Sequence, residues 1–269
     1  MSTRWRSLLF VPANRPDLAA KATRSGPDAV VLDLEDAVPP AGKAEARATA
    51  RAAAAELVGQ VPVCVRVNPP ATAWFAEDVA ALPPGLTAVV VPKLDSVAQL
   101  DEVAAALGGL AVVAGLETVL GVADARTLLR PPITACYFGA EDYVADLGGA
   151  RTDGNAEVAS VRSHVAIAAR LAGIPALDMV TLDFGDHDRF VTEAREARAL
   201  GYAGKLCIHP AQVGLANEAF RPSAEELDWA RGVLQAFADA GGRTIAVDGQ
   251  MVDEVVASRA RAIVAAAEA

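Results

Sequence analysis

Eight short apolar runs, separated by longer segments with helical periodicity, constrain the fold of this chain more than any other feature. The runs are rich in Val, Leu and Ile, and most show little alternation of polar and apolar residues. Such runs are typical of parallel strands covered by helices on both faces. The predicted strands are Ser7–Val11, Ala29–Leu34, Val63–Asn68, Ala88–Pro92, Ala111–Leu116, Ala135–Phe138, Met179–Asp183 and Leu206–Ile208.

Amphipathic patterns between and after these runs predict helices. Asp188 is the expected N-cap of one of them and Gly201 its C-terminal stop. Ser223 and Glu226 have the spacing of a capping box. The predicted helices include Pro16–Arg24, Lys43–Val58, Val97–Leu107, Gly121–Leu129, Glu157–Leu171, Asp188–Leu200, Gln212–Phe220, Ser223–Ala240 and Glu254–Ala267.

Eight strand–helix units in 269 residues fit a (β/α)₈ TIM barrel, which needs roughly 250 residues. We expect the barrel over residues 1–222 and a C-terminal helical extension over 223–269. An extended segment, Gly241–Asp253, separates the last two helices and either covers the active site or packs on a neighbouring subunit. The alternative is an open doubly wound sheet, which predicts a Gly-rich turn after an early strand; Val11–Asn14 is no such turn.

Charge and composition exclude several classes of protein. The net charge of −10 argues against nucleic-acid binding, which needs a basic face. No apolar segment reaches the ~20 residues of a membrane span, and the first apolar run is too short for a signal peptide. Cys64, Cys136 and Cys207 each stand alone in apolar sequence, as buried thiols do in a reducing compartment. We therefore expect a cytoplasmic protein.

Charged side chains follow the predicted strands one after another. In a barrel of this type the active site lies at the C-terminal ends of the strands. A single carboxylate there is often only a helix cap or an ion-pair partner, but a succession of them predicts a shared site. The strand ends in question read Leu32–Asp36, Val65–Asn68, Val91–Lys93, Gly115–Thr118, Phe138–Asp142, Leu182–Asp183 and Ile208–His209.

Glu117 and Asp142 are the best candidates for metal ligands among these residues. Glu117 directly follows an apolar strand, where a charge is unfavourable unless a cation or hydrogen bonds satisfy it. Two carboxylates, completed by waters and substrate oxygens, suit Mg²⁺. No cluster of His or Cys indicates zinc.

Three other strand-end residues have two readings each. Arg66, inside an apolar strand, is either the structural partner of neighbouring carboxylates or a clamp for a substrate carboxylate. Lys93 either forms an ion pair or forms a Schiff base with a carbonyl substrate. His209 is either a general base or a cap for the helix that follows it.

The motifs named above, taken in order, resemble those of the citrate lyase β-subunit family. This family includes citryl-CoA, malyl-CoA and citramalyl-CoA lyases, within the phosphoenolpyruvate/pyruvate-type barrels. The resemblance covers nearly the whole chain. It rests on Leu9–Asn14, Leu32–Asp36, Val65–Asn68, Val91–Lys93, Leu116–Thr118, Gly139–Asp142, Ile208–Pro210 and Gly249–Asp253.

The resemblance implies a (β/α)₈ barrel, commonly trimeric, that binds Mg²⁺ and CoA thioesters. By position, Glu117 and Asp142 match the ligands of Mg²⁺. Arg66 and Glu117 match residues that contact the substrate, and Arg66 is also expected to act in catalysis.

The resemblance also implies roles near both ends of the chain. Phe10 and Lys21 match positions that contact the CoA portion, and Arg15 is a looser match for a phosphate contact. Asp253 matches an acidic residue that some lyases of this family use in catalysis, either in its own site or in that of a neighbouring subunit. Ala13 stands where the first motif of the family often has Gly.

The expected activity is Mg²⁺-dependent cleavage of a 3-hydroxyacyl-CoA to an acyl-CoA and an oxo acid, or the reverse condensation. The first alternative is an aldolase that forms a Schiff base on Lys93. The second is a non-catalytic binding or assembly subunit, since a citrate lyase β-subunit works with a carrier protein and an α-subunit.

Overall fold

The structure, a computed structural model, describes residues 4–247 and 249–268. The chain divides into two compact units, one that ends at Asn217 and one that begins at Glu218. The boundary predicted from the sequence falls between residues 222 and 223. The two units are described separately below.

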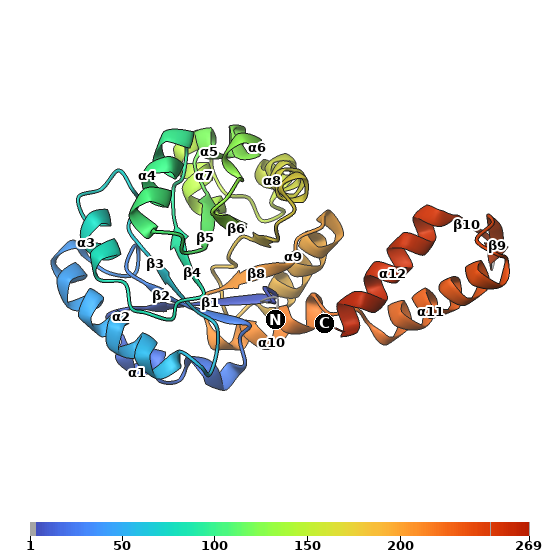
Figure 1. Ribbon diagram of the computed structural model, residues 1–269, viewed down its shortest axis with the longest axis horizontal. Helices are drawn as coiled ribbons and strands as arrows, with labels where there is room; N and C mark the ends of the chain where they lie inside the picture. The colour runs from blue at the N-terminus through green and yellow to red at the C-terminus, as the bar shows by residue number, and fades with distance from the viewer. Residues whose placement is uncertain (1–3, 248, 269) are drawn as a thin grey trace. The chain divides into compact units, whose positions relative to one another are not determined.

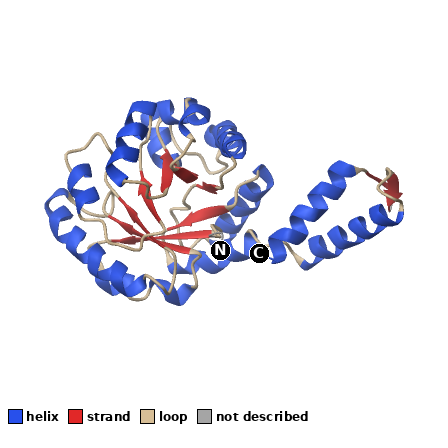
Figure 2. Cartoon of the chain, in the orientation of Figure 1, coloured by secondary structure: helices blue, strands red, loops and turns tan. Residues whose placement is uncertain are grey.

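The first unit is a closed barrel of eight parallel strands in the order β1 to β8 (Figure 1). Helices surround the strands, which lie at the centre of this unit (Figure 2). The prediction of a (β/α)₈ barrel is therefore confirmed, and the open sheet is excluded. The strands are β1 Ser7–Pro12, β2 Ala29–Asp33, β3 Val63–Arg66, β4 Ala88–Val91, β5 Val112–Leu116, β6 Ile133–Phe138, β7 Ala176–Asp178 and β8 Gly204–Cys207.

Helices and short 3₁₀ segments (η) connect the strands. The amphipathic patterns placed most of the longer helices to within a few residues. The helical segments of this unit are α1 Pro16–Ala19, η1 Ala22–Ser25, η2 Pro40–Gly42, α2 Lys43–Leu57, α3 Phe75–Ala80, α4 Val97–Leu107, α5 Val119–Ala123, α6 Ala125–Leu128, α7 Ala140–Leu147, η3 Ala156–Val158, α8 Ala159–Ala172, α9 His187–Leu200 and most of α10 Pro210–Ala219.

The interior of the barrel is one apolar cluster to which every strand contributes. Because side chains alternate between the two faces of a strand, the same face recurs every second residue. Small and aliphatic side chains fill this space, and Tyr137 is the largest member of the cluster. The buried members are Leu8, Ala29, Val31, Cys64, Ala88, Val90, Val113, Ala135, Tyr137, Leu177 and Leu206.

The predicted seventh strand, Met179–Asp183, is wrong, because β7 is Ala176–Asp178 and residues 179–183 form a loop. Asp178 is fully buried, and its carboxylate accepts two hydrogen bonds from Arg162 of α8. In the sequence, a charged residue such as Asp178 is typical of the end of a strand. The strand was therefore predicted in the apolar run that follows Asp178. The ion pair with Arg162 is what allows the charge inside the strand.

Three predicted helix features also differ from the structure. The predicted helix Pro16–Arg24 is divided into α1 and η1, and Gly121–Leu129 is divided between α5 and α6 at Asp124. The N-cap of α9 is Asp186 and not Asp188, since the Asp186 side chain accepts the hydrogen bond from the backbone N–H of Arg189.

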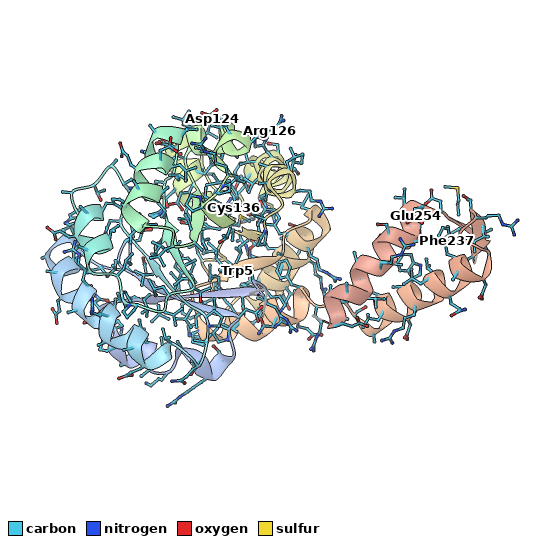
Figure 3. The ribbon with its side chains drawn as sticks, viewed as in Figure 1. Trp5, Asp124, Arg126, Cys136, Phe237 and Glu254 are labelled. Carbon is cyan, nitrogen blue, oxygen red and sulfur yellow. The ribbon has the colours of Figure 1, made fainter. Side chains whose placement is uncertain are left out.

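The second unit is a pair of helices joined by a two-stranded antiparallel hairpin. It consists of α11 Ala224–Asp239, β9 Ile245–Val247, β10 Gln250–Val252 and α12 Glu254–Glu268. The predicted capping box of Ser223 and Glu226 is present at the start of α11. This unit has its own apolar core between the two helices, and Phe237 belongs to it (Figure 3).

Across residues 4–247 and 249–268, no helix has both the length and the apolar character needed to cross a membrane.

Candidate active site

A cavity of about 430 Å³ opens at the C-terminal ends of the barrel strands. It joins side chains from five strands with Glu117, which directly follows β5, the first turn of α7 and the loop after β7. Its lining residues are Phe10, Pro12, Asp33, Asp36, Ala37, Arg66, Glu117, Tyr137, Gly139, Ala140, Glu141, Asp142, Val180, Leu182, Leu206 and Ile208.

The alternation of side chains along the strands explains why charged residues reach this cavity. Two residues beyond the interior Val31 comes Asp33, and two residues beyond Cys64 comes Arg66. β2 and β3 therefore present apolar side chains to the core and, at their C-terminal ends, a charged side chain to the cavity.

Glu117 is one of two carboxylates of the cavity, with Asp33, that have only 2% of their surface exposed. One carboxylate oxygen, Oε1, accepts a hydrogen bond of 2.9 Å from the backbone N–H of Lys93. The other, Oε2, lies against Gly139, where a Cβ atom would be only 2.5 Å away. Burial, followed by the nearby charge of Glu35, raises the pKa of Glu117 to about 7. A cation beside this carboxylate would offset the unfavourable free energy of burying its charge.

Arg66 is held by three carboxylates. Its Nε and Nη2 atoms bind the two oxygens of Asp33 at 2.7 and 2.8 Å, and Nη1 lies 2.9 Å from Glu35. Asp36 is a more distant partner at 3.5 Å. The guanidinium also lies over the ring of Phe10, 5.1 Å from its centroid. The structural-partner reading of Arg66 is confirmed, and the guanidinium still faces the cavity.

Lys93 links the two predicted metal ligands. Its ammonium lies 2.8 Å from Glu35 and 3.2 Å from Asp142, while its backbone N–H binds Glu117. Burial alone would lower the pKa of Lys93, but the hydrogen bond to Glu35 and the surrounding carboxylates raise it. A Schiff base needs a neutral amine, so this environment disfavours that role.

Asp142 lies in the first turn of α7 and faces the same cavity as Glu117. Within the described part of the chain, no three His, Cys, Asp or Glu residues form a cluster that could hold a metal. Two carboxylates that leave most of the shell to water and substrate match the way proteins hold Mg²⁺. The oxygen donors of Glu117 and Asp142 therefore fit this ion, and the described residues of the cavity lining include none of the His or Cys residues that are typical of zinc sites.

The residues expected to bind CoA lie in different surroundings. Phe10 lines the cavity and packs edge-on against Tyr137, with ring centroids 6.4 Å apart. Arg15 is exposed and forms a bidentate pair with Asp17. Lys21 is exposed and precedes η1.

Asp253 and His209 act as helix caps in this structure. Asp253 belongs to the second unit, and its carboxylate accepts a hydrogen bond from the backbone N–H of Val256 at the start of α12. His209 stacks on Phe184 at 4.6 Å, and its Nδ1 atom accepts a hydrogen bond from the backbone N–H of Ala211.

Sequence reasoning missed two buried residues near the site. The ammonium of Lys43 donates to the backbone oxygens of Leu34 and Glu35 and to Asn68, so it fixes the segment that carries Glu35. Tyr137 lines the cavity from inside an apolar strand, where nothing in the pattern marked it as different from a core residue.

Known proteins are similar to this chain over most of its length. The family model for HpcH/HpaI aldolase/citrate lyase matches residues 6–210. A citrate lyase subunit beta-like protein of Deinococcus radiodurans is 50% identical, over 96% of this chain and 95% of that protein. A (3S)-malyl-CoA thioesterase of Cereibacter sphaeroides is 32% identical, over 98% of this chain and 95% of that protein.

A solved structure is similar over the whole chain. It is protein CitE from Mycobacterium tuberculosis in complex with magnesium, acetoacetate and coenzyme A, with a TM-score of 0.86 and 37% identity over 99% of both chains. The match of the family model, the extent of the similar sequences and the barrel itself lead to one assignment. The chain belongs to the HpcH/HpaI aldolase/citrate lyase family.

Proposed function

We propose that this chain is a Mg²⁺-dependent carbon–carbon lyase that cleaves a 3-hydroxyacyl-CoA to an acyl-CoA and a 2-oxo acid, or catalyses the reverse condensation. The observation that carries the proposal is the buried Glu117, which faces the same cavity as Asp142 and Arg66. The magnesium and coenzyme A of the CitE structure support the same reading.

Glu117 and Asp142 would hold the metal. A bound Mg²⁺ supplies positive charge beside the hydroxyl and carboxylate of the substrate, which lowers the pKa of that hydroxyl. Lys93 fixes one oxygen of Glu117 through its backbone N–H. Arg66, fixed by Asp33 and Glu35, presents a guanidinium that contacts the substrate and stabilises negative charge near the cleaved bond.

The remaining roles concern the thioester half of the substrate. Cleavage leaves an enolate on the α-carbon of the thioester, and Asp253 would protonate it as a general acid. Phe10 would pack against the CoA portion, and Arg15 and Lys21 would meet its phosphates. We further propose that the chain acts in the cytoplasm as a trimer, and that Asp253 serves its own or a neighbouring subunit's site.

The first test is a product assay with malyl-, citramalyl- and citryl-CoA in the presence of Mg²⁺. We expect an acyl-CoA and an oxo acid, and no turnover with a chelator. Release of free CoA and an intact hydroxy acid would instead indicate a thioesterase. A borohydride-trapped adduct on Lys93 with a 2-oxo acid would indicate the aldolase, and no effect of Mg²⁺ or CoA ligands on stability would favour an assembly subunit.

The variant Glu117→Ala should lower kcat/KM by about 100-fold or more. It removes a ligand of the Mg²⁺ ion whose charge would stabilise the transition state. Glu102→Ala, at an exposed position on α4, is the matched control and should retain full activity. Full activity of Glu117→Ala would remove the basis of the proposal.

A further inference from the structure

Tyr137 of β6 carries a buried hydroxyl that lines the cavity and has no hydrogen-bond partner among the described residues. The side chain is 1% exposed. Two other buried side-chain atoms also lack a hydrogen-bond partner in the described part of the chain, Oε2 of Glu35 and Nε2 of His164, but neither residue lines the cavity. A phenylalanine would fill the same space without a polar atom to satisfy, so packing alone does not account for the hydroxyl.

The hydroxyl lies beside Gly115, two residues before Glu117. Val113, Gly115 and Glu117 fall on the same face of the chain, because side chains alternate along a strand, and this face points into the barrel. Gly115 and Tyr137 are direct neighbours on β5 and β6. A Cβ atom at Gly115 would lie 2.5 Å from the Tyr137 oxygen, so the glycine provides the room for the hydroxyl.

The Tyr137 hydroxyl is a hydrogen-bond donor and not a base. Burial, followed by the negative charge of Glu117, raises the pKa of Tyr137 well above its usual range, while Arg66 acts in the opposite direction. These charges place the hydroxyl at the polar end of the cavity, although it forms no hydrogen bond with Glu117 or with any other described residue. A neutral phenol can donate its hydrogen to an oxygen of a ligand.

The other side-chain donor of the cavity already has partners. Among the described residues that line it, Arg66 is the one donor besides Tyr137. Each of its three nitrogens lies beside a carboxylate oxygen of Asp33, Glu35 or Asp36. Arg66 still acts on a ligand through its charge, but its hydrogen bonds are largely directed to these carboxylates.

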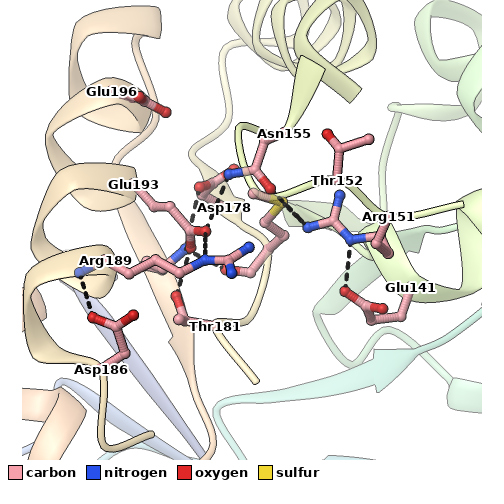
Figure 4. Close-up of polar contacts among 12 residues, drawn as sticks. Glu141, Arg151, Thr152, Asn155, Asp178, Thr181, Asp186, Arg189, Glu193 and Glu196 are labelled. Carbon is pink, nitrogen blue, oxygen red and sulfur yellow. Dashed lines mark hydrogen bonds and ion pairs between the residues drawn. The ribbon is translucent and has the colours of Figure 1, made fainter. Parts of the chain in front are cut away.

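Two further arginines, in a separate pocket beside the cavity, are paired in the same way (Figure 4). Arg151 donates a 2.9 Å hydrogen bond to Glu141, and Arg189 donates one of 3.0 Å to Glu193. Neither arginine is part of the cavity lining. They hold the wall between the two pockets and add no donor to the cavity.

The depth of the hydroxyl indicates which part of a substrate it would meet. A cavity of about 430 Å³ has room for the small acid end of a CoA thioester, so the long CoA arm must extend toward solvent. The acid end carries the oxygens that would bind a metal at Glu117 and Asp142. Because Tyr137 lies next to the strand end that carries Glu117, its hydroxyl is close to this end of the substrate.

We propose that the Tyr137 hydroxyl donates a hydrogen bond to an oxygen of the oxo-acid half of the substrate, which makes Tyr137 a further substrate-binding residue. This inference rests on the lyase function proposed above. The phenol keeps its proton throughout, so it contributes by binding and orienting the acid end and not by proton transfer.

The test is Tyr137→Phe, which removes the hydroxyl and keeps the ring. Isothermal titration calorimetry with Mg²⁺ present would measure the affinity for glyoxylate, pyruvate and oxaloacetate, the oxo acids that correspond to the three thioesters named above. For the oxo acid that the wild-type protein binds most tightly, we expect Kd to rise by about fivefold or more, as for the loss of one hydrogen bond. The Kd for CoA should change by less than about twofold.

Tyr202→Phe is the matched control, at a tyrosine that is 4% exposed and does not line the cavity. Its hydroxyl has a protein partner, because it donates a 2.9 Å hydrogen bond to the backbone oxygen of Arg162. Without metal or ligand, Tm should fall by about 2 °C or more for Tyr202→Phe. It should not fall for Tyr137→Phe, which loses no protein partner. Tyr202→Phe should leave the affinity for the oxo acid unchanged.

An unchanged oxo-acid affinity of Tyr137→Phe would overturn the inference and leave the lyase function standing. An equal loss of affinity for CoA, or a fall in Tm as large as that of Tyr202→Phe, would show that the hydroxyl supports the structure of the cavity, and the inference would be wrong. If the wild-type protein binds none of the oxo acids with Mg²⁺, the lyase function itself is wrong and the inference falls with it.

Discussion

The environment of Glu117 determines how the site is expected to respond to pH. Its folded-state pKa, raised by burial to about 7, lies above the ordinary value of 4.5. At a pH between these two pKa values, the Glu117 carboxyl is deprotonated in the unfolded chain and keeps its proton in the metal-free folded protein. The contribution of Glu117 to stability therefore falls as pH rises through this window. A cation favours the carboxylate, so metal binding must release the retained proton.

We accordingly predict that the affinity for Mg²⁺ rises by up to about tenfold per pH unit below pH 7 and levels off above it. Calorimetry in two buffers of different ionisation enthalpy would measure the protons released, which should approach one per metal ion at low pH. Glu141→Gln, in the same cavity, should keep this dependence. An affinity that does not change between pH 6 and 8 would show that Glu117 is not a ligand.

The candidate metal ligands could be predicted from the sequence because strand ends in a barrel converge. Glu117 and Asp142 follow apolar runs directly, so their place at the rim depends only on the fold class. The part of the cavity formed by the loop after β7 could not be predicted in this way. Val180 and Leu182 were assigned to a strand, and which side chains of a loop face a cavity depends on tertiary contacts such as that of Thr181 with Glu193.

At the level of elements, buried charges hold the barrel closed between β7, β8 and their helices. Asp178 of β7 binds Arg162 of α8, and its Oδ2 atom lies 3.4 Å from the ammonium of Lys205 of β8. Lys205 also reaches Glu193 of α9. The number of strands could be predicted from the eight apolar runs. The position of β7 could not, because the partners that allow Asp178 inside the strand, Arg162 and Lys205, are distant from it in the sequence.

Lys205→Met should destabilise the protein by about 3 kcal/mol or more, because it leaves part of the charge of Asp178 and Glu193 buried without its partner. Chemical unfolding followed by circular dichroism would measure the change. Arg130→Met, which breaks the exposed pair with Asp101, is the comparison and should change stability by about 1 kcal/mol or less. A similar small effect for Lys205→Met would contradict the structural importance of the cluster.

At the level of the whole molecule, the catalytic residues proposed here are divided between two units. Glu117 lies in the barrel, and Asp253 precedes α12 in the second unit. Asp253→Asn is a suitable variant because Asn also caps helices well, so the start of α12 is preserved. We expect it to lower kcat strongly without loss of folding.

If Asp253 serves a neighbouring subunit, an inactive Asp253→Asn protein and an inactive Glu117→Gln protein should recover activity when their subunits are mixed. About a quarter of the wild-type activity is expected, because one pairing in four unites two intact halves of a site in a closed ring. Mixing the folded proteins without subunit exchange is the control. No recovery after exchange would place Asp253 in the site of its own chain.

The separate cores of the two units have a consequence for how the protein loses activity on heating. The core of the second unit is small and is built from α11, α12 and the hairpin alone. A core of that size supports only marginal stability, and two units with separate cores need not unfold in one cooperative step. Calorimetry would then show two transitions. Warming would first abolish turnover while the barrel continued to bind magnesium, so thermal inactivation would be a poor measure of the stability of the barrel.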